Sequence, residues 1–437
     1  MKPLGPIPAG FTTVGGELAI GGRRASELVA EAGDTPLFVY DLALVRARIA
    51  RLRAALPPAA AIHYAVKANP CRPLVEAMVP LVDGFDVASA GEMRLALEAG
   101  MPAGRISFAG PGKRDDEIAA AIAAGVTLNA ESEGEVARAL KLGSATSGNR
   151  PRLAVRVNPP FELRGSGMRM GGGARPFGVD SGRVPALVRR IVAAGADYRG
   201  LHIFAGSQSL DPQAIAEAQA NGLALAAEIA RESGAAAPLV NLGGGFGVPY
   251  FAGDRALDVE AIGAALATNP FVLGLSKHGS PAGQEEQHGD RLGVKGEGER
   301  PLAVELGRWL VAEAGVYLAR IVDRKESHGR LFLVTDGGLH HQLAASGNFG
   351  TVVRRNYPVA IASRFGAAPE EEASVVGCLC TPLDRLADDA HLPRADVGDL
   401  VAVFLAGAYG ASASPAAFLG HPPAREMLVD GGIPQRS

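Results

Sequence analysis

A lysine stands at the end of a short apolar run near the start of the chain. Lys67 follows Ala61–Val66 within the sequence HYAVKANP, which is typical of a buried strand that ends in a turn. A lysine amine in that position is costly unless it is paired or used chemically. Its side chain can reach solvent at the rim of the fold, or it can form a Schiff base with an aldehyde cofactor. Position alone favours the first explanation, so other residues must decide.

Candidate phosphate-binding groups follow three later apolar runs. The glycine triplet 243–245 would let backbone N–H groups approach an anion, and GSQ at 206–208 adds a hydroxyl donor. ELGR at 305–308 supplies a carboxylate and a guanidinium, and the guanidinium is well suited to phosphate. Three glycines alone are a weak signal. One lysine, several phosphate donors and one acid, each after its own run, together indicate a single site.

Eight short apolar runs alternate with longer stretches of helical period. Stretches such as GEMRLALEAG carry an acidic residue near their start and stop at glycine, as capped helices do. Eight such units predict an α/β fold, a (β/α)₈ TIM barrel. We prefer it to an open doubly wound sheet because polar residues and glycines follow nearly every run. The predicted strands are 61–66, 85–89, 106–110, 127–131, 153–158, 200–206, 239–245 and 302–307.

The two ends of the chain show a different sequence pattern from the middle. After about residue 315, runs such as VYLARIVDRKE and DLVAVFLAGAYG read as strands without long helices between them, and FTTVGGELAI and TPLFVYD near the start look similar. We therefore expect a barrel over 39–315 and a β-sandwich or β-barrel domain over 316–437, completed by an N-terminal segment, 1–38. The polar, glycine-rich segment 278–300 is expected to form a mobile loop.

Bulk composition excludes several classes of function. The 437 residues are 47% apolar with a net charge of −3 and no dense Lys/Arg run, which argues against nucleic acid and membrane surfaces as partners. Neither a signal peptide nor an apolar run of membrane-spanning length is present, so we expect a cytoplasmic protein. The cysteines are too few and too badly spaced for a disulfide framework or a zinc site; they are Cys71, Cys378 and Cys380.

Histidines add no predicted function. His340 and His341 are adjacent, so their side chains point to different faces of most backbones, and no acidic residue stands at ligand spacing. We therefore predict no metal site. His63 and His202 lie inside apolar runs and are expected to be satisfied core histidines.

Several motifs together resemble a known family. HYAVKANP, FDVASAGE, GLHIFAGSQ, NLGGGFG, ELGR, GCLCTPLD and AGAYG occur in the order found in the fold-type-III pyridoxal-phosphate decarboxylases. That family includes diaminopimelate, ornithine and biosynthetic arginine decarboxylases, and the resemblance runs from TPLFVYD to GAYGASASPAAF. It implies pyridoxal 5′-phosphate as cofactor, a barrel with a β domain, and a homodimer whose active sites are shared between subunits.

The resemblance also implies roles for single residues. Lys67 would carry the cofactor, and Glu305 would face its pyridine nitrogen. A carboxylate there keeps the ring protonated, so the ring can take up the electrons left when CO₂ departs, whereas arginine would favour racemisation. Cys380 matches the cysteine that a partner subunit donates as the acid. The implied cofactor contacts are Lys67, Asp86, Arg156, Phe204, Ser207, Gly244, Gly245, Glu305, Arg308 and Tyr409.

Three departures from the family pattern concern the substrate. Phe204 replaces a histidine that stacks on the cofactor ring, and Thr381 replaces an acid that binds a distal ammonium. Ala344 and Ala345 occupy the region where diaminopimelate decarboxylases carry an arginine for the distal carboxylate. Asp384 is an alternative acid, which makes Thr381 and Asp384 the candidate substrate contacts.

A further set of motifs resembles a subgroup found beside exosortase and exopolysaccharide genes: HIFAGSQ, ARPFGVD, GGGFGVPYF, DGGLHHQLAASGNFG, CTPLD and AYGASASP. It is also similar to a butirosin-pathway enzyme that acts on glutamate tethered to an acyl carrier protein. We expect a decarboxylase of an L-amino acid or of an aminoacyl group, and a carrier-protein arm would explain the missing distal charge. A diaminopimelate decarboxylase of lysine biosynthesis, or a pyridoxal-phosphate-binding homologue without decarboxylase activity, stays open as the alternative.

Overall fold

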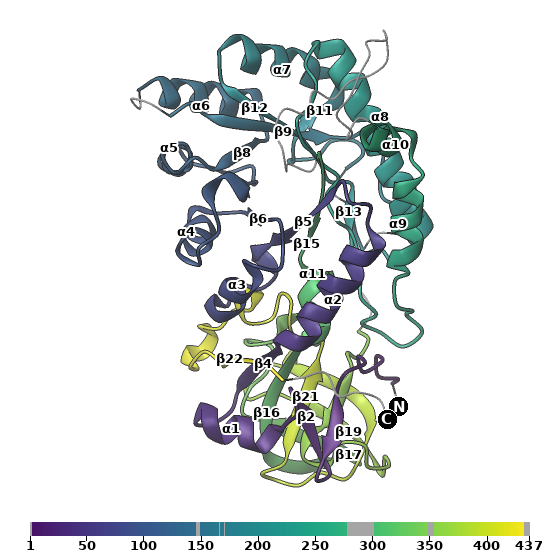
Figure 1. Cartoon of the computed structure of the whole chain (residues 1–437). Helices are drawn as coiled ribbons and strands as arrows, with labels where there is room; N and C mark the ends of the chain where they lie inside the picture. Colours follow the sequence, from purple (N-terminus) through teal and green to yellow (C-terminus); the bar gives the residue numbers. More distant parts are fainter. Residues whose placement is uncertain are drawn as a thin grey trace.

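The protein folds around a barrel of strands and a second, separate β-structure, as Figure 1 shows for this computed structural model. Both are built from a chain whose ends meet in the second β-structure. The structure describes residues 2–145, 149–165, 167–169, 171–277, 301–347 and 354–431. The predicted loop at 278–300 lies outside these residues.

Eight parallel strands form the closed barrel. Each strand pairs with its neighbour, and the pairing of the fourth strand with the fifth completes the ring, which excludes an open sheet. The predicted barrel is therefore confirmed, with a strand in every predicted run. The strands are β5 (Ala60–Ala65), β6 (Gly84–Val87), β7 (Ile106–Phe108), β8 (Thr127–Ala130), β9 (Arg152–Asn158), β12 (Asp197–Ile203), β14 (Val240–Asn241) and β15 (Leu302–Leu306).

Some of these strands are shorter than their apolar runs because the backbone turns early. β14 holds only two residues, and the glycine triplet after it leaves the strand with Gly243 at φ 66° and Gly245 at φ 84°. The Gly243 N–H donates to the Asn241 side chain at 2.9 Å, which closes the turn. Positive φ favours glycine, so the sequence sets where the strand stops. The freed backbone lies at the carboxyl end of the barrel.

Helices surround the barrel strands (Figure 1). Local capping sets their ends: Ser89 accepts the Glu92 N–H at the start of α4, and α5 stops at left-handed Gly125. The helices are α2 (Leu42–Ala55), α3 (Arg72–Met78), α4 (Ala90–Glu98), α5 (Asp115–Ala124), α6 (Glu133–Ala145), α7 (Val184–Ala193), α8 (Pro212–Ser233), α9 (Val259–Ala267), α10 (Pro270–Lys277) and α11 (Arg308–Val311), with short strands β10 (Met168–Arg169), β11 (Val179–Asp180) and β13 (Gly206–Ser207) between them. None of the described helices is both long and apolar enough to cross a membrane.

The second β-structure is a mixed sheet centred on β16 (Gly315–Ser327). β4 (Leu37–Asp41) pairs antiparallel with β16 and parallel with β22, so a strand from early in the chain joins this sheet. β4 crosses the predicted boundary between the N-terminal segment and the barrel. A small sheet of β1 (Thr12–Val14), β2 (Glu17–Ile20) and β3 (Arg23–Arg24), followed by α1 (Ala25–Ala32), packs Leu18 and Ile20 against Val316 and Leu318. The remaining strands are β17 (Arg330–Thr335), β18 (Val359–Ile361), β19 (Glu371–Val376), β20 (Arg385–Leu392), β21 (Leu400–Phe404) and β22 (Arg425–Val429).

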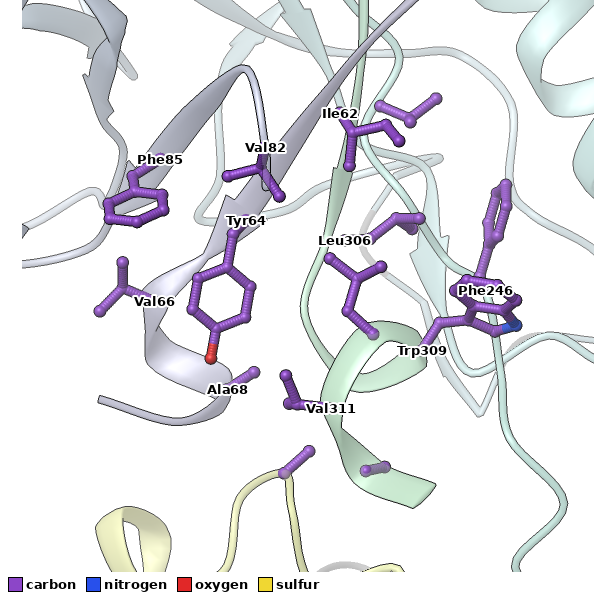
Figure 2. Close-up of a cluster of buried hydrophobic side chains, with 14 of the residues drawn as sticks. Ile62, Tyr64, Val66, Ala68, Val82, Phe85, Phe246, Leu306, Trp309 and Val311 are labelled. Carbon is purple, nitrogen blue, oxygen red and sulfur yellow. The ribbon is translucent and has the colours of Figure 1, made fainter. Parts of the chain in front are cut away.

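A buried apolar cluster supports the carboxyl end of β5 and β15. Figure 2 shows Tyr64 and Val66 on one side and Leu306 and Trp309 on the other, all buried. The Tyr64 hydroxyl donates to the Asn69 carbonyl at 2.8 Å, across the turn that carries the lysine. Close packing on both sides of this turn restricts the directions that the lysine side chain can take.

The barrel also contains a buried ion pair, and we expect its loss to lower the stability of the protein. Lys113 and Glu135 have side chains 1% and 2% exposed, and their charged atoms lie 2.8 Å apart. We expect Lys113→Met to cost about 3–5 kcal/mol, because Glu135 is left buried without its cation. Arg51→Met, which removes an exposed pair with Glu260, should cost about 1 kcal/mol or less. Urea unfolding measures both variants; equal losses would contradict the prediction.

Candidate active site

Three charged or polar side chains meet at the carboxyl ends of β5, β12 and β15. The Lys67 amine, in the turn just after β5, lies 3.3 Å from one carboxylate oxygen of Glu305. The other oxygen lies 2.9 Å from Nε2 of His202, on β12. The Glu305 side chain is 3% exposed and that of Lys67 is 46% exposed. The carboxylate is therefore enclosed, while the amine faces open space above it.

Lys67 and Glu305 influence each other's protonation. Burial opposes ionisation of Glu305, but the Lys67 ammonium and the His202 hydrogen bond hold the pKa of that carboxyl below its usual range. In turn, the Glu305 charge raises the pKa of Lys67 above its ordinary value. Glu305 is consequently an ionised acceptor at neutral pH, which is the state needed to hold a proton on a pyridine nitrogen.

Backbone from two loops crowds together beside this centre. A Cβ on Gly244 would lie 2.1 Å from the Glu305 carbonyl oxygen, and a Cβ on Gly245 would lie 2.8 Å from that of Gly206. Only glycine allows these approaches. Ser207 follows Gly206 in β13, so its hydroxyl and the bare backbone of the triplet belong to adjacent loops. This arrangement suits a phosphate held by N–H and O–H donors.

Arg308 adds a cation to the same end of the barrel. One of its terminal nitrogens donates to the Tyr250 hydroxyl at 2.6 Å, and its guanidinium lies 4.7 Å from the ring centre of Tyr409. Its Nε is buried and has no hydrogen-bond partner within the part of the chain that the structure describes. Tyr409 itself donates its N–H to the Ala68 carbonyl at 2.8 Å, next to Lys67. A buried guanidinium with an unused donor fits an anionic ligand such as a phosphate.

Asp86 and Arg156 lie in buried networks on neighbouring strands. Asp86 is 3.2 Å from Nδ1 of His63 and accepts a hydrogen bond from Ser107. Arg156 pairs with Glu131 at 2.7 Å. Both side chains are therefore fixed in position without a ligand, as orienting residues must be.

Phe204 lies close to the lysine. The Lys67 amine is 5.9 Å from the centre of the phenyl ring, and the His202 ring is 6.3 Å from it. Phe204 follows His202 by two residues and stands just after the end of β12. A flat apolar surface next to the amine suits stacking against an aromatic cofactor.

The turn after β19 carries the residues predicted to contact substrate. Cys380 is exposed and Thr381 is partly exposed. Asp384 is buried, and its two oxygens accept the N–H groups of Leu339 at 2.6 Å and Leu379 at 2.8 Å. Among the residues that the structure describes, no hydrogen bond or ion pair links this turn to Lys67 of the same chain.

Sequence reasoning missed two residues of this site. His202 was expected to be an ordinary core histidine, but its partner is Glu305. Its place two residues before Phe204, on the same face of a predicted strand, was the available signal. Glu131, which pairs with Arg156 and also accepts the N–H of Gly110 at 2.6 Å, ends the predicted strand 127–131. Its position at the carboxyl end of a predicted barrel strand was the sequence signal that could have identified it as a site residue.

The chain is similar to known proteins over most of its length. The family described as "Pyridoxal-dependent decarboxylase, pyridoxal binding domain" matches residues 42–270. An L-glutamyl-[BtrI acyl-carrier protein] decarboxylase from Niallia circulans is 34% identical, over 91% of this chain and 90% of the relative. A diaminopimelate decarboxylase from Methanothermobacter thermautotrophicus is 31% identical, over 95% and 91%.

Solved structures share the whole architecture. The diaminopimelate decarboxylase of M. jannaschii in complex with L-lysine superposes with a TM-score of 0.83 at 24% identity, covering 97% of this chain and 93% of that one. A protein from Aquifex aeolicus, AQ1208, gives a TM-score of 0.78 at 27% identity, over 97% and 93%. The chain belongs to the pyridoxal-dependent decarboxylases, the family of diaminopimelate decarboxylase, and its cofactor is pyridoxal phosphate.

Proposed function

We propose that this decarboxylase acts on an amino acid whose side chain is attached to an acyl carrier protein. The observation that carries the proposal is the state of Asp384. Its two carboxylate oxygens are both held by backbone N–H groups, so it is a poor partner for a substrate ammonium, and Thr381 carries no charge. We therefore assign Asp384 to shaping the turn rather than to substrate contact.

The described residues of the predicted distal pocket also lack a cation that could bind a distal carboxylate of the substrate. Among the described residues near the predicted distal pocket, Ala344 and Ala345 offer no cation. Arg354 donates to the Arg385 carbonyl, and Arg355 lies over the Phe251 ring at 3.8 Å from its centre. A pocket without a distal charge partner suits a side chain whose end is neutralised by an acyl linkage.

The chemistry itself restricts where such an arm can be attached. Loss of the α-carboxylate requires a free α-amino group to join the cofactor and a free α-carboxylate to leave. The arm must therefore be attached at the side-chain end of the amino acid. The relative from Niallia circulans, named for a glutamyl group on a carrier protein, supports this class of substrate.

We assign the following roles to the residues of the barrel. Lys67 holds the cofactor aldehyde, and the bound cofactor supplies an acceptor for the electron pair released with CO₂. Glu305 keeps a proton on the pyridine nitrogen, and His202 fixes the carboxylate by its hydrogen bond. Asp86 and Arg156 orient the ring, and Phe204 covers one of its faces. The phosphate is held by Ser207, Gly244, Gly245, Arg308 and Tyr409.

We assign the last proton transfer to Cys380. After CO₂ leaves, the substrate α-carbon must gain a proton, and the Cys380 thiol can donate it. Cys380 is exposed on a turn that, among the described residues, has no hydrogen bond or ion pair to Lys67 of its own chain. We therefore propose that it completes the site of a partner subunit in a homodimer.

The lysine assignment has a spectroscopic test. Purified wild-type protein should absorb in the violet because of the covalent link between Lys67 and the cofactor, and borohydride should abolish the band. Lys67→Ala should lack it even with added cofactor. Lys325→Ala, which changes a lysine on β16, is the control and should keep the band. A band retained in Lys67→Ala would refute the assignment.

The shared site has a complementation test. Lys67→Ala and Cys380→Ser should each be nearly inactive alone, while co-expressed subunits should regain about one quarter of the wild-type rate. Random mixing makes half of the dimers heterodimers, and each heterodimer keeps one intact site of two. CO₂ release measures the rate. If mixing restores no activity while both variants still form dimers, Cys380 does not act across subunits.

The proposed substrate class can be tested by comparing the decarboxylation of tethered and free amino acids. CO₂ release should be at least about 10²-fold more efficient, as kcat/KM, for a side-chain-linked glutamyl-carrier protein than for free glutamate, diaminopimelate, ornithine or arginine. The control is the same carrier without the aminoacyl group. Efficient turnover of free diaminopimelate would instead support the alternative of a diaminopimelate decarboxylase. A protein with the violet band but no turnover of any of these would contradict the proposed substrate class.

A further inference from the structure

Three side chains with metal-binding atoms gather in the β domain. His340 follows β17, Cys378 begins the turn after β19, and His421 precedes β22. Their ligand atoms all lie within 4.8 Å of one another. The segments are far apart in sequence, so the adjacent histidine pair considered earlier gave no hint of this cluster.

His340 lacks the partners that a buried imidazole normally has. The residue is fully buried, and neither ring nitrogen has a hydrogen-bond partner among the described residues. Leaving such a group unpaired costs about 1–3 kcal/mol. The neighbouring His341 differs: one nitrogen lies 3.1 Å from the Tyr317 hydroxyl and the other 2.9 Å from the Pro422 carbonyl. The free nitrogens of His340 therefore call for a ligand that the chain does not supply.

The cluster is close to the spacing of a tetrahedral site. The Cys378 sulfur lies 4.0 Å from Nδ1 and 3.9 Å from Nε2 of His421. Metal bonds of about 2.0–2.3 Å at tetrahedral angles place neighbouring ligand atoms roughly 3.3–3.6 Å apart. Small side-chain movements would close this difference. The Cys378 sulfur also lies 3.5 Å from the Asp336 carbonyl, which keeps it directed into the cluster.

We propose that His340, Cys378 and His421 bind one Zn²⁺ ion, with a water molecule in the fourth position. Two imidazoles and one thiolate are a ligand set that zinc prefers. On binding, the Cys378 S–H bond breaks, its proton passes to solvent, and a zinc–sulfur bond forms, with no change of oxidation state. The nearest carboxylate on this turn, Asp384, is occupied by backbone N–H groups and is not a ligand.

The ion would join three segments that have separate attachments in the β domain. Cys378 stands two residues before Cys380, and His421 stands four residues before β22, which pairs with β4. A zinc ion here would hold the turn that carries Cys380 against the rest of the domain. That link to catalysis rests on the proposed role of Cys380. The metal site itself does not.

The test is the metal content of tag-free holoenzyme, equilibrated with zinc under reducing conditions and then dialysed. Mass spectrometry of the metal should find about one zinc per chain in wild type. Cys378→Ser and His421→Asn should each lose most of it. Matched controls, Cys71→Ser and His391→Asn, should keep it. Retention of the violet cofactor band shows that each variant is folded.

Cobalt gives a second readout on the wild-type protein. Co²⁺ in place of zinc should produce a sulfur-to-metal charge-transfer band in the near ultraviolet, and Cys378→Ser should remove it. Wild-type protein without zinc, or without the sulfur band, would overturn the proposal, as would full zinc content in Cys378→Ser. The cluster would then be a buried histidine group satisfied by water. Neither result depends on decarboxylase activity, so failure of the proposed substrate is a separate outcome.

Discussion

A buried carboxylate is the constraint on which this site depends. Glu305 is almost fully enclosed, and an enclosed charge is stable only when it is paired and hydrogen-bonded. Its partners come from separate elements, Lys67 from the turn after β5 and His202 from β12, and the closed barrel brings them together. β15 pairs with β5, and Glu305 is in register with His63. β12 pairs with β14, which lies between β12 and β15 in the barrel. An open sheet would leave the ends of these strands in a row rather than facing one another.

The barrel alone does not complete the site. The Asn69 side chain, two residues after the lysine, donates to the Gly407 carbonyl at 3.0 Å, and Tyr409 donates its N–H to Ala68 at 2.8 Å. The turn that carries Lys67 is therefore hydrogen-bonded to the segment that follows β21. Both β-structures therefore contribute to one active site.

The sequence predicts the parts of the fold that repeat and misses those that depend on distant pairing. Apolar runs ending in glycine or polar residues mark all eight barrel strands, because each strand shows the same local pattern. β20 was not predicted, since RLADDAHL alternates poorly and its acids are neutralised elsewhere: Asp388 pairs with Lys2 and Asp389 with Arg330. The contact between His202 and Glu305 is equally hidden from local patterns, because 103 residues separate the two.

The residues proposed for the chemistry and those proposed for substrate choice lie in two parts of the molecule. The proposed electron-accepting site rests on barrel strands, whereas the residues expected to choose the substrate lie on the turn that Asp384 shapes. Thr381 can thus stand where the family pattern led us to expect an acid without disturbing Glu305. Losing a distal charge pair removes binding energy, and a free amino acid has little else to offer. A carrier protein contributes contacts far from the reacting carbon, and such remote binding can position the substrate. An uncharged pocket is therefore consistent with catalysis when the amino acid arrives on a carrier arm.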